Sequence, residues 1–199
     1  MVEPGDYLTL ASYAAAGIAL AACAGMRAFL PLFVVGLAGR LGRFELSDGY
    51  HWLASDPALL VFGVAVVLET LADKIPLVDH ALDAVQTVLK PAIGTIAAAA
   101  LFVQLPPFLA TVVGLIVGGS VATAVHLAKA KIRLFSTLAT GTTLNPILSF
   151  TEDLVATVIA AVAILAPILA LLLVAFLAGL LFHRVHKRRV RPGAGAAGH

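Results

Sequence analysis

The feature that most constrains this chain is a series of long apolar segments separated by short polar ones. About 20 apolar residues are enough to cross a bilayer as a helix, and inside lipid a helix satisfies its own backbone hydrogen bonds. Only 12% of the residues are charged, against roughly 25% in soluble domains. We therefore predict an all-α, polytopic transmembrane helix bundle of about six spans, drawn from residues 8–39, 57–72, 80–103, 108–127, 147–166 and 168–182.

The first apolar stretch is too long for one straight span. Its 32 residues, 8–39, would extend about 48 Å as a helix, whereas the hydrocarbon core is roughly 30 Å thick. Gly25 and Pro31 flank Arg27, so the helix either breaks there or tilts and protrudes. A helix followed by a half-helix would change the predicted topology.

We expect one transmembrane domain over residues 1–186 and a basic, then Gly/Ala-rich, disordered tail over 187–199. The tail and the basic residues Lys129, Lys131 and Arg133 fall on one side if the last two spans form a hairpin. The positive-inside rule makes that side cytoplasmic, and counting six spans places the N-terminus there too. Loop 40–56 then faces outward. The N-terminus lacks the basic segment of a signal peptide, so the first span is expected to be retained.

Two segments 70 positions apart show a similar pattern: "DKIPLVDHALDAVQTV" from Asp73 and "TTLNPILSFTEDLVATV" from Thr142. In each, a polar loop ends in proline and leads into a span that begins with acidic residues. We interpret them as an internal repeat with halves at about 8–103 and 108–183, whose relative orientation is undecided. The aligned residues are Pro76 and Pro146, Asp79 and Ser149, Asp83 and Asp153, Val85 and Val155, Thr87 and Thr157, and Val88 and Val158.

Polar side chains recur at helical spacing within these spans. The series Asp79, Asp83, Gln86 and Lys90 predicts a polar stripe along one helix face. A charge held at mid-bilayer costs about 3 kcal/mol on insertion scales, so such charges usually face the bundle interior and pair with one another. Arg27 and Lys90 are the expected counter-ions of the acids. The candidate ion-pathway residues are Arg27, Glu69, Asp73, Asp79, Asp83, Lys90, Asn145, Ser149, Glu152 and Asp153.

Several of these motifs resemble a known family. The segments "GMRAFLPL", "ETLADKIPLVD" and "TLNPILSFTED" are similar to those of an uncharacterised bacterial integral membrane family, domain of unknown function 4126. The resemblance covers the chain from Ala24 to Pro167. It implies a small multi-pass protein of the bacterial inner membrane, with no activity assigned.

Three functions are compatible with this pattern. The first is a transporter or channel for a small cation, divalent or proton-coupled, in which the candidate metal ligands are Glu69, Asp73, Asp83 and Asp153. The second is a non-catalytic membrane scaffold or lipid-organising protein, and the third is a Mg²⁺-dependent intramembrane enzyme acting on a lipid diphosphate. We favour the first, with no enzymatic activity and no cofactor beyond a divalent cation. The expected partners are the bilayer and a small cation or proton, not nucleic acid, and homo-oligomerisation is left open.

Two further expectations concern individual residues. Gly114 and Gly118 form a GxxxG spacing, which we interpret as tight packing within the bundle rather than as a dimer face. His126 is expected at the membrane interface, and no second histidine lies at a ligand spacing from it.

Overall fold

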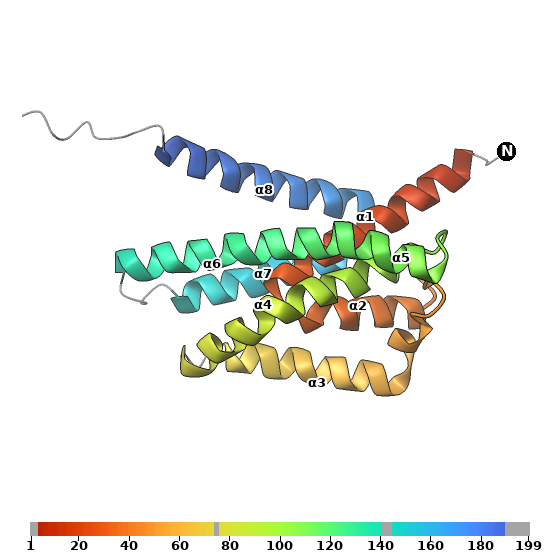
Figure 1. Ribbon diagram of the computed structural model, residues 1–199, viewed down its shortest axis with the longest axis horizontal. Coiled ribbons are helices and arrows are strands. Elements are labelled where there is room, and N and C mark those ends of the chain that lie inside the picture. The colour runs from red at the N-terminus through yellow and green to blue at the C-terminus, as the bar shows by residue number, and fades with distance from the viewer. Residues whose placement is uncertain (1–3, 74–75, 141–144, 190–199) are drawn as a thin grey trace, which may run out of the picture.

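Every element in the described part of the chain is helical, as predicted. The computed structural model describes residues 4–73, 76–140 and 145–189, with side chains described for 6–73, 85–135, 148–180 and 183. The helices run roughly along one long axis (Figure 1). They are α1 (Pro4–Met26), α2 (Phe29–Arg40), the short 3₁₀ helix η1 (His51–Ala54), α3 (Asp56–Ala72), α4 (Pro76–Ala99), α5 (Pro107–Gly114), the π-helical turn η2 (Leu115–Gly119), α6 (Ser120–Thr140), α7 (Asn145–Leu165) and α8 (Pro167–Arg189).

The first apolar stretch is broken at Arg27. α1 ends at Met26 and α2 begins at Phe29. Pro31 explains the position of the break, because in a continuous helix its ring would clash with the carbonyl of Arg27 and it could not donate to it. In the first turn of α2 that missing donor costs nothing. The helix plus half-helix alternative is therefore the one adopted.

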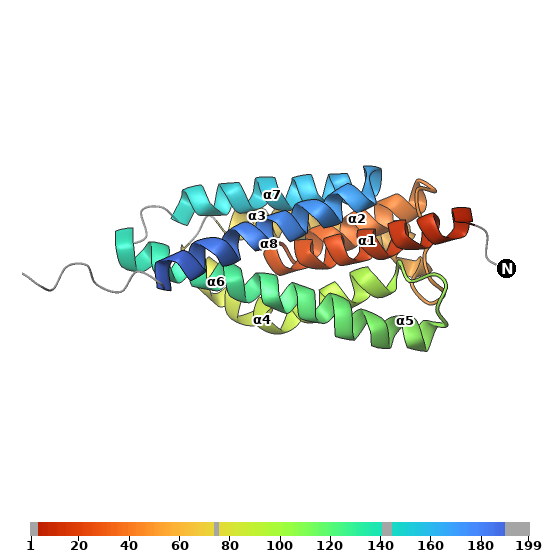
Figure 2. The same ribbon diagram turned by 90° about the horizontal axis from the view of Figure 1, so that it is seen from above.

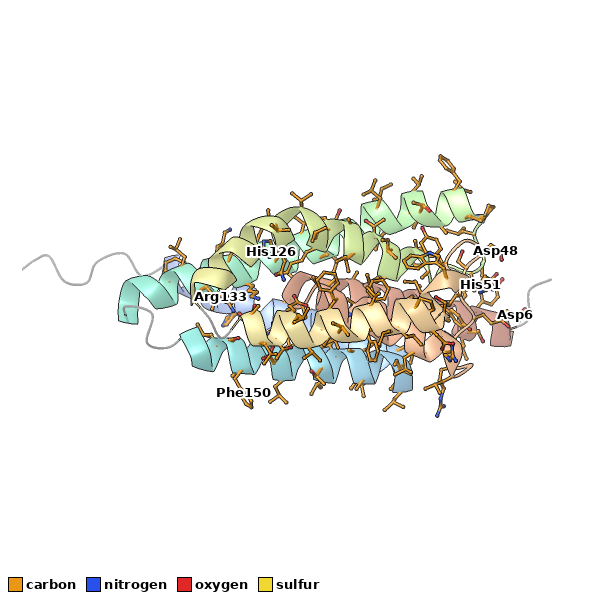
Figure 3. All side chains as sticks on the ribbon, turned by 90° about the horizontal axis from the view of Figure 1, so that it is seen from below. Asp6, Asp48, His51, His126, Arg133 and Phe150 are labelled. Atoms are coloured by element: carbon orange, nitrogen blue, oxygen red, sulfur yellow. The ribbon has the colours of Figure 1, made fainter. Side chains whose placement is uncertain are left out.

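The half-helix α2 turns back toward the end of the bundle where α1 begins (Figures 1 and 2). Asp6 at the start of α1 and Asp48 and His51 beyond α2 accordingly lie at the same end, opposite Arg133 (Figure 3). α8 ends at the opposite end from the start of α1 (Figure 1). The prediction that both termini share a side counts the first stretch as one crossing, whereas the structure breaks that stretch into α1 and α2; the membrane side of each terminus stays a prediction.

α1 is the central helix of the bundle. It packs against α4, α6, α7 and α8, and its residues Ala15, Ala16, Ala19 and Ala21 are almost completely buried. Small side chains let four helices approach one helix closely. In a membrane there is no hydrophobic driving force between helices, so this close van der Waals packing is what holds them together. Cys23 lies in the same buried face, where its thiol donates to the carbonyl of Ala156 at 3.5 Å.

The outer surface is apolar. α3 alone exposes Leu60, Val64, Leu68 and Leu71, each at least half accessible. Contiguous exposed apolar surface of this kind is rare on soluble proteins. Among the described residues, three helices are long and apolar enough to cross a membrane, Asp6–Met26, Pro107–Phe135 and Leu148–Leu165, and two shorter apolar helices are Phe29–Arg40 and Pro167–Leu180.

α5, η2 and α6 form one continuous helix, longer than the predicted stretch 108–127, so Lys129 and Arg133 lie within it rather than in a loop. It crosses α4 at glycines. A Cβ on Gly118 would lie 2.3 Å from the carbonyl oxygen of Gly94, and one on Gly94 would lie 2.5 Å from the Cβ of Ala122. The GxxxG glycines therefore pack within the chain, as predicted. α4 and α7, which carry the two similar segments, run in the same direction (Figures 1 and 2); the duplication itself stays a prediction.

Candidate functional site

Charged and polar side chains from five segments meet in the half of the bundle where α3 ends and α4 begins. His126 and Arg133 mark this half, and Asp48 and His51 mark the opposite end (Figure 3). The side chains of the cluster are buried or mostly buried. Its members are Arg27 between α1 and α2, Glu69 and Asp73 at the end of α3, Gln86 and Lys90 on α4, His126, Lys129 and Arg133 on α6, and Ser149, Glu152 and Asp153 on α7.

Arg27 is the centre of this cluster. Its guanidinium contacts Asp73 at 2.5 Å and forms a second ion pair with Asp153. The side chains of Arg27 and Asp73 are only 4% exposed, whereas that of Asp153 is 22% exposed. A planar guanidinium suits two carboxylates at once. Arg27 therefore joins α1, α3 and α7, and Asp153 is the more accessible of its two partners.

Glu69 has a different partner from the one predicted. The N-terminus of α2 has no side-chain cap of its own, since Ala28 occupies the cap position. The amides of Ala28 and Phe29 donate instead to the two oxygens of Glu69, at 2.8 and 3.2 Å, and Gln86 donates to the same carboxylate at 2.8 Å. A carboxylate is favourable at a helix N-terminus because of the free amides and the helix dipole. Glu69 thus fixes the inner end of the half-helix.

Glu152 forms the second part of the network, with two bases from α6. Lys129 and Arg133 each lie 3.1 Å from its Oε2 atom. Arg133 also lies 3.9 Å from Asp73, and Lys129 donates to the carbonyl of Met26, the last residue of α1, at 3.3 Å. These contacts connect Glu152 to the Arg27 centre through Arg133 and the shared acid Asp73, and through the end of α1.

A half-open cavity of about 140 Å³ lies beside Arg27. Its polar wall consists of Arg27, Glu69, Asp153 and the hydroxyl-bearing Thr70 and Thr157. Leu30 of α2 and Val66 of α3 complete it. This is comparable to a cavity that holds a small molecule or several waters, and most of its polar groups present oxygen atoms.

The structure brings together part of the predicted site. Arg27, Asp73, Glu152 and Asp153 form one network, Glu69 shares the cavity wall, and Lys90 and Ser149 are buried. The side chains of Asp79, Asp83 and Asn145 lie outside those described. Among the described residues, no three of His, Cys, Asp or Glu are grouped as a metal site, so the predicted ligand set, which includes Asp83, stays a prediction.

Four members of the cluster are not among the predicted site residues: Gln86, which was predicted only as part of the polar stripe, and His126, Lys129 and Arg133. The sequence indicates that Lys129 and Arg133 follow the fourth span and that His126 is interfacial, yet each is at most 9% exposed. The spacing of these three residues along the sequence could have indicated that they are buried on one helix face. Together with Gly118 and Ala122 they lie three or four residues apart, so all five share one face of a continuous helix.

Comparison with known proteins places the chain in an uncharacterised group. The model of a family described as a domain of unknown function (DUF4126) matches residues 14–187. No curated protein and no solved structure matches the chain.

Proposed function

We propose that this chain, which belongs to the DUF4126 family, carries a small cation across a membrane, as a transporter or a channel. The observation that supports the proposal is the position of Asp153, which pairs with Arg27 and also lines the cavity. An arriving cation can take the Asp153 carboxylate from the guanidinium, because both compete for the same oxygens. When no transported ion is in the cavity, Arg27 takes the place of that ion and keeps the Asp153 carboxylate paired.

The charge balance favours a monovalent cation or a proton. One guanidinium shared by two carboxylates leaves the group of Arg27, Asp73 and Asp153 with one net negative charge. Because Arg27 stays paired with Asp73, a single positive charge on Asp153 neutralises this group, whereas a divalent ion leaves an excess charge in a low-dielectric interior. Thr70 and Thr157 line the same cavity and carry no charge.

The half-helix gives further support. The 12 residues of α2 extend about 18 Å, more than half of a hydrocarbon core roughly 30 Å thick. Its N-terminus therefore ends inside the bilayer, as in many transporters built from discontinuous helices. We place the protein in the bacterial inner membrane as a multi-pass protein whose basic C-terminal end is cytoplasmic, with the start of α1 on the other side.

A scaffold is the second candidate. One observation favours it: Glu69, Asp73, Glu152 and Asp153 all have partners inside the protein. Such a network can hold helices in register without moving any ion. The two functions differ in whether Asp153 exchanges its partner.

Flux through proteoliposomes tests the proposal. Purified protein is reconstituted, a Na⁺, K⁺ or H⁺ gradient is imposed, and ion movement is followed with ion-selective dyes. We expect wild-type flux and its loss by at least about tenfold in Asp153→Asn, which keeps the shape of the side chain but not its charge. Asp56→Asn is the matched control, because the Asp56 carboxylate is 79% exposed and pairs only with Arg40 among the described residues. Absence of wild-type flux, or equal flux in Asp153→Asn, would favour the scaffold.

A further inference from the structure

Lys90 and His126 form a buried pair that the ion-exchange site does not use. The Lys90 side chain has no exposed surface, and His126 is 6% exposed. The Lys90 ammonium lies 3.2 Å from Nδ1 of His126, and Nε2 of the same ring lies 3.2 Å from the hydroxyl of Thr87. Both nitrogens of the imidazole therefore have a polar neighbour from α4.

The close crossing of α4 and α6 sets this contact. Gly94 lies one helical turn beyond Lys90, and Ala122 lies one turn before His126. Gly94 is in such tight contact with Ala122 and Gly118 that a Cβ would not fit. The two helices are thus held together one turn away from the pair, so neither side chain can withdraw by helix separation alone.

The hydrogen-bonding chemistry of the Lys90 ammonium and the His126 imidazole determines which ring nitrogen carries the proton when no further proton is bound. A lysine ammonium has three donors and no acceptor, so Nδ1 of His126 must present its lone pair to it. The ring proton is then on Nε2 and donates to Thr87. A proton that binds Nδ1 removes that acceptor, and the Lys90 ammonium has to leave it. Lys90 and an incoming proton therefore compete for Nδ1, as Arg27 and a cation compete for Asp153.

Other titratable groups stand on the helices packed against this pair. α6 carries Lys129, Lys131 and Arg133, α1 carries Cys23, Arg27 follows the end of α1, and Glu69 of α3 reaches α4 through Gln86. α5 and η2 carry no titratable residue, and the only one on α2, Arg40, is at its far end. On α4 itself, Asp79, His80 and Asp83 have side chains outside those described.

We propose that the Lys90–His126 pair is a proton-binding site and that it binds the coupling ion of the transporter. The proton adds to the lone pair of Nδ1, giving an imidazolium with one more positive charge, and leaves from the same atom when Lys90 returns. No bond other than N–H forms or breaks. The coupling part of this proposal rests on the proposed cation transport, whereas the proton site does not.

The first test is the protonation of His126 in the full-length protein. ¹⁵N-histidine NMR in micelles is compared with His126→Gln to assign the His126 signals. We expect a neutral ring with the proton on Nε2 at the upper end of the pH range, and protonation of Nδ1 as the pH is lowered. A ring that carries its proton on Nδ1 at the higher pH, or that never takes a second proton, would overturn the proposal.

The second test separates the proton site from the cation site. His126→Gln keeps an acceptor for Lys90 and a donor for Thr87 but does not titrate; His183→Gln, at an exposed position of α8, is the control. In proteoliposomes we expect His126→Gln to lose proton movement by at least about tenfold while cation movement down its own gradient persists. Unchanged proton coupling in His126→Gln would refute the coupling role. If the wild type moves no ion, the proposed transport fails and with it the coupling role, and the NMR result decides the proton site.

Discussion

Two arginines stand at the two ends of the half-helix α2, and they behave differently. Arg27 precedes its inner end, is 4% exposed and pairs with two carboxylates from other helices. Arg40 ends it at the outer side, is 48% exposed, pairs with Asp56 at 2.6 Å and donates to the carbonyl of Ala54 at 3.3 Å. Both form ion pairs, but only Arg27 is itself buried.

The difference shows how burial changes the contribution of an ion pair to stability. At the outer end, water solvates both partners, so the pair adds little to stability. At the inner end, each charge depends on its partners, because the surrounding helices and lipid offer no replacement. A buried pair therefore persists for a reason such as register or ion exchange, and its disruption should have large effects.

The largest expected effect comes from the two arginines themselves. Arg27→Met leaves Asp73 and Asp153 without their shared cation and should destabilise the protein by about 3–5 kcal/mol. Arg40→Met should cost less than about 1 kcal/mol. Unfolding in mixed detergent micelles, followed by circular dichroism, measures both. Similar losses for the two variants would contradict the contrast between the ends of α2.

The acids next to these arginines extend the comparison. Glu69→Gln replaces the carboxylate that accepts from two amides of α2 and from Gln86, and should cost about 1–3 kcal/mol because a buried donor loses its acceptor. The matched change Asp56→Asn, at the exposed N-terminus of α3, should cost less than about 1 kcal/mol. The same unfolding assay applies, and a cost for Asp56→Asn as large as that for Glu69→Gln would contradict the capping role.

Packing should show the same contrast between interior and surface. Gly118→Ala forces a methyl group against the Gly94 carbonyl and should cost about 1–3 kcal/mol through overpacking. Gly179→Ala, in α8 with nothing within 4 Å of its Cβ position, should be neutral or stabilising by up to about 1 kcal/mol. A stabilising Gly118→Ala would show that α4 and η2 are not in close contact there.

The smallest expected effect is that of salt on the exposed pair. A double-mutant cycle on Arg40 and Asp56 should give a coupling energy below about 1 kcal/mol, and it should weaken as salt is raised toward about 1 M because screening shortens to roughly 3 Å. The cycle on Lys129 and Glu152, whose side chains are 6% and 14% exposed, should depend less on salt. An equal salt dependence would mean that water reaches both pairs.

The sequence predicted much of the fold and the centre of the site. The lengths of the apolar segments predicted the helices, and the residues around Arg27 indicated the break between α1 and α2. Helical spacing predicted that Gln86 and Lys90 share one face of α4. The sequence also indicates Arg27 and Lys90 as counter-ions of the buried acids, because an intramembrane charge needs a counter-ion, but it does not assign which acid pairs with which base. What was missed depends on tertiary contacts. The return of α2 and its capping by Glu69 depend on α3 lying beside it, and the burial of Lys129 and Arg133 depends on how far α6 continues past its apolar part.

The central claim is that Asp153 exchanges Arg27 for a transported cation, and binding tests it most directly. We would measure the melting temperature of the detergent-purified protein against Na⁺, K⁺ and other cations at several pH values, with Asp153→Asn beside the wild type. An ion that binds only the folded state raises the free energy of unfolding by about 2.7 kcal/mol when its concentration is 100 times its Kd. The account predicts a rise that is selective for one cation and absent in Asp153→Asn. A melting temperature that responds to no cation at any pH, or that rises equally in both proteins, would contradict it.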